Sequence, residues 1–410
     1  MELVDIFEEM VTTGQPPSDN CSLLGVGYDQ AFQALKKVYL ERGFARGRST
    51  EKFIIGPYGS GKTHFLRQLL ELSQQMDCVT AEVPLSQDVD ISKPLLIYKE
   101  VVRALRVPEQ KIPGKGLGVL ISDVLERFRV ESGNENGEWQ DEFVCSRIAA
   151  FEDYPFEDER FRRIVPKTLL ALFRGENDIY ESGLRWLAGE VNDALVAKAL
   201  GIGRIPTTEQ DGFGRRALLC LCQFIKEAGY RGTVIGFDEA EQAMNVPKRT
   251  VQRILSMARA EIDFIARVNN AAVLVVYAFT PDVVQEMQQY PALQQRLAEP
   301  DPSRLFFDGN IYSPRIELDQ VKLGSLEFLE NISERLIKLF YQEYGDELKE
   351  PMEEILRQSR DWAEEISSAN PSISNRREIV KLTCSKLLEL YDGFEGFSYV
   401  EPENPGDAEV

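Results

Sequence analysis

The feature that most constrains this chain is a glycine-rich segment between an apolar run and an amphipathic run. Residues 56–63 read Gly-Pro-Tyr-Gly-Ser-Gly-Lys-Thr and match the pattern G-x-x-x-x-G-K-[ST]. Residues 53–55 predict a short buried strand before the segment, and the apolar spacing of residues 62–75 predicts a helix after it. A strand, a tight turn and a helix in this order predict a loop that binds the phosphates of a nucleotide.

The chemistry of phosphate binding explains the residue types in this loop. Glycines let the backbone turn tightly and point its N–H groups at phosphate oxygens. Lys62 would reach the β- and γ-phosphates, and the Thr63 hydroxyl would ligate Mg²⁺. We therefore expect ATP and Mg²⁺ as cofactors. The residues expected at the nucleotide are Gly56, Pro57, Tyr58, Gly59, Ser60, Gly61, Lys62, Thr63 and His64.

A second apolar run, residues 233–237, ends in the acidic pair Asp238-Glu239. Phosphoryl transfer needs a carboxylate that organises the metal and a group that orients the attacking water. Asp238 would hold Mg²⁺ through its water shell, and Glu239 would polarise the water. Strands often end in acids for structural reasons, so the weight of this pair comes from its combination with the phosphate loop.

Three further residues are candidates for contacts with the γ-phosphate. Thr280 follows the apolar run 273–279 and could touch the γ-phosphate, or could simply cap the helix predicted at Pro281. Arg296 follows one helix later, where an arginine finger that acts on a neighbouring subunit could sit. Arg376 opens the last long helix and could reach back from a lid. For both arginines, the alternative is a solvated charge or a surface salt bridge.

Alternation of strands and helices predicts an α/β fold with a parallel sheet. The strands are expected at residues 53–55, 78–83, 233–237, 272–279 and, as a last short one, 312–318. Helical spacing is found at residues 31–40, 62–75, 95–105, 117–128, 161–173, 183–200, 215–228, 248–269, 326–344, 351–368 and 376–391.

These elements suggest four parts of the chain. Residues 1–50 are expected to form an N-terminal helical segment. Residues 51–320 would form the phosphate-loop domain, with a helical insertion at about 93–229. Residues 321–395 would form a helical lid, and the acidic residues 396–410 a disordered tail.

The formal net charge of −20 disfavours the surface as a whole as a platform for nucleic acid. The best local site for DNA is the basic stretch Lys36, Lys37, Arg42, Arg46 and Arg48, for which a solvated helix end is the favoured alternative. No apolar run is long enough to span a bilayer, and the N-terminus is acidic, so we expect a cytoplasmic protein. Cys220 and Cys222 are expected in the core, and His64, the only histidine, at the helix start as a packing residue.

Several segments together resemble the BrxC/BrxD-type P-loop ATPases of BREX bacteriophage-exclusion systems. The resemblance extends to about residue 390, and Tyr28 stands where related ATPases often carry an arginine near adenine. The segments are 14–17 (Gly-Gln-Pro-Pro), 58–66 (Tyr-Gly-Ser-Gly-Lys-Thr-His-Phe-Leu), 93–98 (Lys-Pro-Leu-Leu-Ile-Tyr), 185–190 (Arg-Trp-Leu-Ala-Gly-Glu), 200–202 (Leu-Gly-Ile) and 229–232 (Gly-Tyr-Arg-Gly).

This resemblance implies an AAA+-like ATPase with a helical lid that acts, with other system proteins, in defence against phage DNA. It also implies the roles of Lys62, Thr63, Asp238 and Glu239 stated above, and it favours Arg376 as a lid arginine. We expect hydrolysis of ATP to ADP and phosphate in a nucleotide-dependent homo-oligomer. The alternatives are a regulatory switch that binds ATP without hydrolysis and a loader that itself grips DNA.

Overall fold

The computed structural model describes residues 2–17, 19–85, 93–108, 114–133, 140–239, 270–301, 303–320, 325–369 and 375–392. The chain divides into two compact units, one of Met1–Pro17 with Leu323–Val410 and one of Ser18–Lys322. Residues 1–50, which we expected to form one segment, are thus shared between the units. The helix expected at residues 248–269 and the tail at 396–410 lie outside the described residues.

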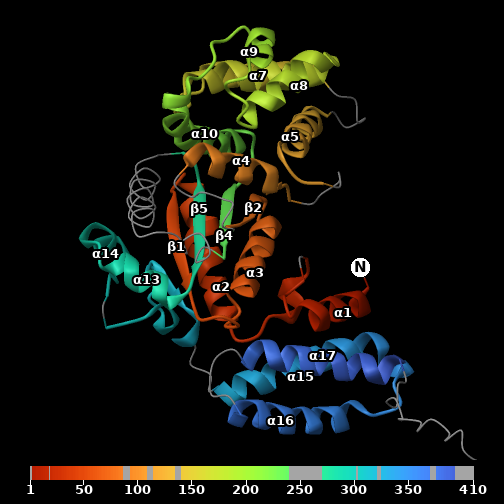
Figure 1. The fold of residues 1–410 in the computed structure, drawn as a ribbon. Helices are drawn as coiled ribbons and strands as arrows, with labels where there is room; N and C mark the ends of the chain where they lie inside the picture. The colour runs from red at the N-terminus through yellow and green to blue at the C-terminus, as the bar shows by residue number, and fades with distance from the viewer. Residues whose placement is uncertain are drawn as a thin grey trace, which may run out of the picture. The chain divides into compact units, whose positions relative to one another are not determined.

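The larger unit contains one six-stranded sheet in the order β3-β2-β4-β5-β1-β6 (Figure 1). The strands are β1 (Thr50–Ile55), β2 (Cys78–Pro84), β3 (Leu105–Arg106), β4 (Gly232–Asp238), β5 (Val273–Phe279) and β6 (Arg315–Glu317). Every pairing is parallel except that of β3 with β2. The predicted α/β fold with a parallel sheet is therefore confirmed, and the two-residue strand β3 is an element that we did not predict.

Both faces of the sheet are covered, which explains why its strands read as nearly continuous apolar runs. On one face, Ile235 and Phe237 of β4 belong to the hydrophobic core that extends into the insertion. On the other face, a Cβ on Gly236 would lie 2.7 Å from the Leu66 side chain of α3 (Lys62–Gln75). The helix that follows the phosphate loop is thus packed directly on β4.

The helical insertion shares one hydrophobic core with the sheet. Phe161, Trp186 and Phe213 form an aromatic cluster within it, with ring centroids 5.4–6.3 Å apart. Cys220 and Cys222 are buried in this core, as expected. The helices of the insertion are α4 (Pro94–Ala104), α5 (Leu117–Ser132), α6 (Asp141–Asp153), α7 (Glu159–Arg174), α8 (Asn177–Leu187), α9 (Ala194–Leu200) and α10 (Gln210–Glu227).

The single helix predicted at residues 183–200 is wrong. The chain leaves α8 after Leu187, and Gly189 adopts a φ of +96°, which an L side chain rarely tolerates. A new helix, α9, then starts after Asp193, whose carboxylate accepts hydrogen bonds from the N–H groups of Leu195 and Val196. The apolar spacing runs through both helices, which is why it does not reveal the break.

An ion-pair network ties the insertion to the edge of the sheet at which β2 and β4 begin. Arg127 of α5 donates to both carboxylate oxygens of Asp77, at 3.2 and 2.6 Å, and to Asp123 at 3.0 Å. Its guanidinium carbon lies 3.8 Å from the ring centroid of Tyr230, whose hydroxyl donates to Asp123. Asp77 directly precedes β2, and Tyr230 lies just before β4, so this network fixes α5 at that edge of the sheet.

The other elements of the larger unit are α2 (Asp29–Leu35), the π-helix η2 (Lys36–Gly43), α13 (Pro281–Gln288) and α14 (Pro291–Leu297). The smaller unit contains α1 (Leu3–Thr13), α15 (Ser325–Tyr344), α16 (Met352–Ala369) and α17 (Asn375–Asp392). In its core, the rings of Phe7 and Phe340 lie 5.1 Å apart. Among the described residues, no helix is both long enough and apolar enough to cross a bilayer.

Loss of the Arg127 network should destabilise the larger unit. We expect Arg127→Ala to lower the free energy of unfolding by about 2 kcal/mol, because two part-buried carboxylates lose their cation. Arg103→Ala is the matched control, since the Arg103 side chain is 70% exposed and pairs with Glu100 on the surface. The control should change stability by less than about 0.5 kcal/mol. Urea titration followed by circular dichroism measures both, and equal losses would contradict the role of the network.

Candidate nucleotide-binding site

Three sequence motifs meet at one edge of the sheet because parallel strands all end there. The loop 56–63 follows β1, Thr280 follows β5, and the acids Asp238 and Glu239 stand at the end of β4. In the order of the sheet, β5 lies between β1 and β4. The end of β5 therefore lies between the loop and the acidic pair.

The loop has the geometry of an anion-binding turn. Gly59 and Gly61 have φ values of +78° and +89°, so the chain turns through left-handed conformations. Helix α3 then begins at Lys62 without a side-chain cap on its first N–H groups. Uncapped N–H groups at a helix start attract negative charge, because the positive end of the helix dipole adds to the partial positive charges of these groups.

The Lys62 ammonium is held at the loop itself. It donates to the carbonyl oxygen of Gly56 at 2.9 Å and to that of Pro57 at 3.3 Å. It also lies 5.3 Å from the ring centroid of Tyr58, a side chain that is 69% exposed. A positive charge that is buried in the mouth of a phosphate loop is suited to bind the β- and γ-phosphates.

The clearest contact between the two motifs joins residues 175 positions apart. The Thr63 hydroxyl donates to Asp238 Oδ2 at 2.7 Å, and Asp238 is only 5% exposed. A hydroxyl and a carboxylate are the hard oxygen ligands that Mg²⁺ prefers when phosphates and waters supply the rest. These two residues therefore fit a magnesium ion that is bound together with a nucleotide.

Glu239 and Thr280 lie at the neighbouring strand ends. Glu239 has a φ of +53°, uncommon for a residue with a side chain, and its N–H donates to Asp238 Oδ1 at 2.9 Å. Such backbone conformations cost about 1–3 kcal/mol and cluster at functional sites. Thr280 occupies the N-cap position of α13, but its hydroxyl does not cap that helix. The hydroxyl has no hydrogen-bond partner among the described residues.

The two candidate arginines lie in different units. Arg296 belongs to α14 of the larger unit, and its side chain lies outside the described structure. Arg376 belongs to α17 of the smaller unit, where its guanidinium lies 4.1 Å from the ring centroid of Phe328. Their predicted contacts with the γ-phosphate stay predictions.

His64 is held by a short segment that sequence reasoning did not assign to the site. Its ring bonds to the backbone of Cys21, and Nε2 is buried without a hydrogen-bond partner among the described residues. The carboxylate of Glu71 fixes this segment by accepting the N–H groups of Cys21 and Ser22, at 2.6 and 2.8 Å. The signal available in the sequence was Glu71, a carboxylate on α3, but the two N–H groups that it accepts lie about fifty residues earlier in the chain.

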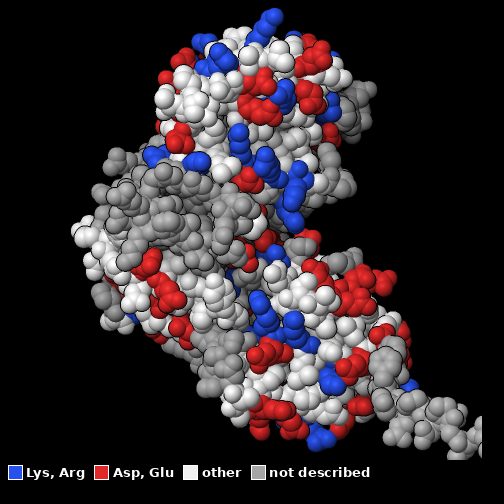
Figure 2. Space-filling model, in the orientation of Figure 1, with Lys and Arg blue, Asp and Glu red and all other residues white. Residues whose placement is uncertain are grey.

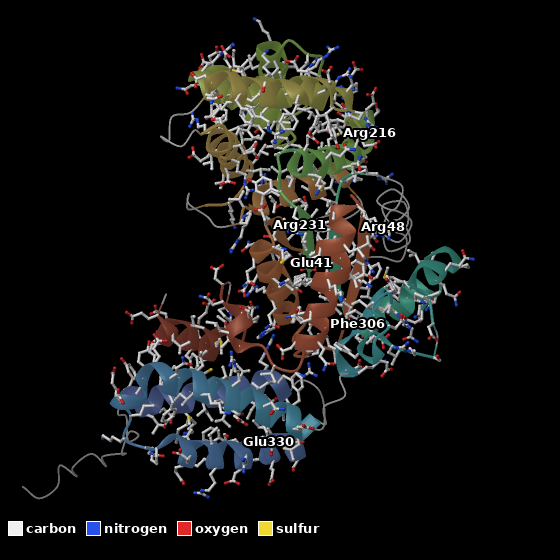
Figure 3. All side chains as sticks on the ribbon, turned by 180° about the vertical axis from the view of Figure 1, so that it is seen from behind. Glu41, Arg48, Arg216, Arg231, Phe306 and Glu330 are labelled. Atoms are coloured by element: carbon white, nitrogen blue, oxygen red, sulfur yellow. The ribbon has the colours of Figure 1, made fainter. Side chains whose placement is uncertain are left out.

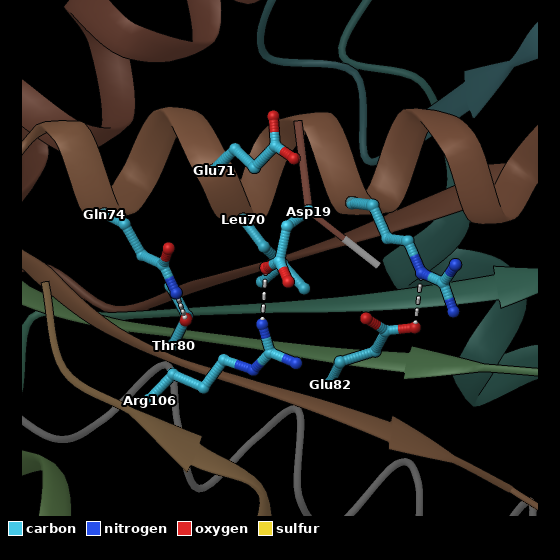
Figure 4. Close-up of a pocket in the computed structure, with 8 residues that line it drawn as sticks. Asp19, Leu70, Glu71, Gln74, Thr80, Glu82 and Arg106 are labelled. Carbon is cyan, nitrogen blue, oxygen red and sulfur yellow. Dashed lines mark hydrogen bonds and ion pairs between the residues drawn. The ribbon is translucent and has the colours of Figure 1, made fainter. Parts of the chain in front are cut away.

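A hollow lies between α3 and the strands β2 and β3 (Figure 4). Four of its five charged side chains form two ion pairs, Arg106 with Asp19 at 2.8 Å and Arg67 with Glu82 at 2.9 Å, and the fifth, Glu71, accepts backbone N–H groups. The Gln74 amide donates to the Thr80 hydroxyl at 2.8 Å. Because these groups bond to one another, we interpret them as structural contacts. The hollow is therefore not our candidate site.

Comparison with known proteins identifies a family. A family model described as BREX system ATP-binding protein BrxC/D matches residues 6–400 of the chain. The matched range includes the phosphate loop and the Asp238-Glu239 pair. No curated protein and no solved structure matches the chain.

Burial of His64 should make stability depend on pH. Burial disfavours the charged ring and lowers the pKa of His64 to about 4, although the Cys21 carbonyl opposes this shift. The unfolded chain binds the proton near pH 6.5, so stability should be lost as the pH falls from about 6.5 to 4. We expect a loss of about 3 kcal/mol at most, beyond the loss seen in His64→Gln.

The single histidine makes this measurement specific to one residue. Urea titrations across this pH range on both proteins give the two stability curves, and their difference removes the contribution of the carboxylates. Parallel curves for the two proteins would show that His64 is not buried in its neutral form.

The backbone conformation of Gly61 should be needed for nucleotide binding. An alanine Cβ at Gly61 would meet no atom within 4 Å, so only the φ of +89° opposes it. That conformation costs an L residue about 1–2 kcal/mol, which predicts a loss of ATP affinity of about 5–30-fold in Gly61→Ala. Gly203→Ala is the control, because Gly203 is equally uncrowded but lacks the positive φ. Titration with a fluorescent ATP analogue measures both, and equal affinities would refute the argument.

Proposed function

The chain belongs to the family of BREX system ATP-binding proteins BrxC/D, and on this basis we propose that it is an AAA+-like ATPase that drives or switches a phage-defence complex acting on DNA. Binding of ATP, hydrolysis to ADP and phosphate, and release of the products would change its conformation or assembly. The observation that supports this best is the hydrogen bond of 2.7 Å between Thr63 and Asp238. It joins the phosphate loop to the acidic strand end at the point where a metal ion is needed.

Each residue of the site has a part in this proposal. Lys62 binds the β- and γ-phosphates, while Thr63 and Asp238 hold Mg²⁺. The metal ion, when bound, neutralises charge that develops on the phosphate oxygens. Glu239 orients and polarises the attacking water, because it directly follows Asp238 at the strand end. Thr280 supplies a hydroxyl between the two motifs, close to the water or the γ-phosphate.

In this proposal, Arg296 and Arg376 are the groups through which assembly of the protein affects the nucleotide site. Arg296 would act as an arginine finger on the site of a neighbouring subunit in a nucleotide-dependent homo-oligomer. Arg376 would reach the γ-phosphate from the helical lid of residues 321–395. A positive charge at the γ-phosphate stabilises the transition state strongly, so its arrival can couple assembly to turnover. We place this protein and its partner proteins of the defence system in the cytoplasm.

Hydrolysis depends on Glu239 in this mechanism, whereas binding does not. We expect Glu239→Gln to bind ATP like the unchanged protein but to release phosphate about 100-fold more slowly, as typical for loss of a proton-transfer group. Asp282→Asn is the control, because Asp282 is exposed one turn from the same strand ends. Phosphate release and ATP affinity are measured for each protein.

The outcomes separate the alternatives. Equal phosphate release from Glu239→Gln and the unchanged protein, at a rate above background, would refute the role of Glu239. ATP binding without release by any of the proteins would favour the non-hydrolysing switch. Lys62→Ala should lose ATP binding altogether, and unchanged affinity in that variant would refute the loop assignment.

A further inference from the structure

A basic segment runs along the π-helix η2 and the turn that leads into β1. Residues 36–48 contain five cations and one carboxylate, Glu41, and so carry a charge of +4 in a chain whose net charge is −20. We define the basic surface as Lys36, Lys37, Arg42, Arg46 and Arg48. Lys36 is half-buried and the other four side chains are exposed. Figure 3 labels Arg48, and it labels Glu41 on the π-helix.

The charges of this surface are not compensated by carboxylates. None of its five cations forms an ion pair with a carboxylate of the described residues. Arg67, Arg106 and Arg127 of the same unit all have acidic partners within 2.9 Å. Over the upper part of the insertion in Figure 2, at α7 (Glu159–Arg174) to α9 (Ala194–Leu200), blue and red side chains are likewise mixed. Uncompensated cations give a positive local potential that attracts polyanions.

The surface is held in place from beneath. The hydroxyl of Tyr39, on the π-helix, donates to the carbonyl oxygen of Ile311 at 2.8 Å. Lys52 of β1, which is 1% exposed, donates to the same oxygen at 3.0 Å and also to Ser313. These bonds tie the π-helix to residues 311–313 and present Tyr312, 58% exposed, beside Arg42, which donates to its hydroxyl at 2.7 Å.

We propose that this basic surface binds the sugar-phosphate backbone of double-stranded DNA without sequence preference. Interfaces with nucleic acid are polar and strongly positive, whereas the cores of protein interfaces need apolar side chains. Among the described residues of this surface and its tie, Tyr312 is the one large exposed hydrophobic side chain. Contacts of lysine and arginine with phosphate oxygens position a duplex and carry no direct sequence information. The inference rests on the proposed function in taking DNA as the partner, and it does not require hydrolysis.

The test measures binding of a fluorescent 30-base-pair duplex by anisotropy over a series of salt concentrations. We expect binding that weakens steeply with salt, because each neutralised phosphate contributes about −0.9 to the slope of log K against log salt. A variant with Lys36→Glu, Lys37→Glu, Arg46→Glu and Arg48→Glu should bind at least about tenfold more weakly and with a slope reduced by about 3–4. Arg42 is kept, because it bonds to Tyr312.

The control reverses four cations elsewhere in the larger unit, the exposed Lys115, Arg163, Lys198 and Arg204. It should bind DNA at least half as tightly as the unchanged protein. Equal losses in both variants, or no duplex binding by the unchanged protein in low salt, would overturn the proposal. Binding of poly-glutamate but not of the duplex would overturn it in favour of an acidic protein partner.

The ATP-binding variant separates this inference from the proposed function. Lys62→Ala should still bind the duplex, so an absence of ATPase activity leaves the DNA result standing. Circular dichroism of each variant shows whether it is folded. Should the fourfold variant be unfolded, the double variant Arg46→Glu/Arg48→Glu, with an expected slope reduction of about 2, takes its place.

Discussion

The parallel hydrogen bonding of β5 with both β1 and β4 is the constraint on which the rest of the structure depends. Parallel pairing makes neighbouring strands end at the same edge, so the loop after β1, Thr280 after β5 and the acids of β4 meet without long connections. The short bond between Thr63 and Asp238 is a consequence of this arrangement. If any one of these strands ran antiparallel to its neighbours, the functional residue at its end would lie at the opposite edge of the sheet.

The described part of the insertion contributes to the hydrophobic core. Trp186, the most distinctive residue of the family-like segment 185–190, is buried at 1% exposure among aromatic rings. The Tyr98 hydroxyl, from the segment 93–98, donates to the carbonyl oxygen of Leu187 at the end of α8. Two of the segments that carry the resemblance thus contact each other. This contact joins α4 to the end of α8, so the structure gives both segments a role in packing.

Local patterns predicted most of the elements, because apolar spacing and glycine turns act over a few residues. The phosphate loop, α3 and the main strands β1, β2, β4 and β5 follow from such patterns, and the acids of β4 were recognised from the chemistry that they share with the loop. Contacts between distant residues could not be read in this way. Arg127 and Asp77 lie fifty positions apart, and nothing in either neighbourhood indicates the partner. The π-helix at Lys36–Gly43 overlaps the run predicted as helix over residues 31–40, and the contacts of Tyr39 and Lys52 with Ile311 are likewise between distant residues.

Helix α3 connects the two edges of the sheet. Its first residues, Lys62 and Thr63, belong to the nucleotide site. Asp77 lies two residues after its end and forms an ion pair with Arg127 of the insertion. Helix α3 packs closely on β4, since a Cβ on Gly236 would lie 2.7 Å from the Leu66 side chain, so a movement of the helix is coupled to the sheet. A shift of α3 on nucleotide binding would therefore displace the Asp77 contact as well. The insertion and the turn that carries Arg46 and Arg48 both adjoin that far edge, since Gly47 abuts Asn270 just before β5. Helix α3 thus links the phosphate loop to the edge of the sheet at which the insertion and the turn with Arg46 and Arg48 lie.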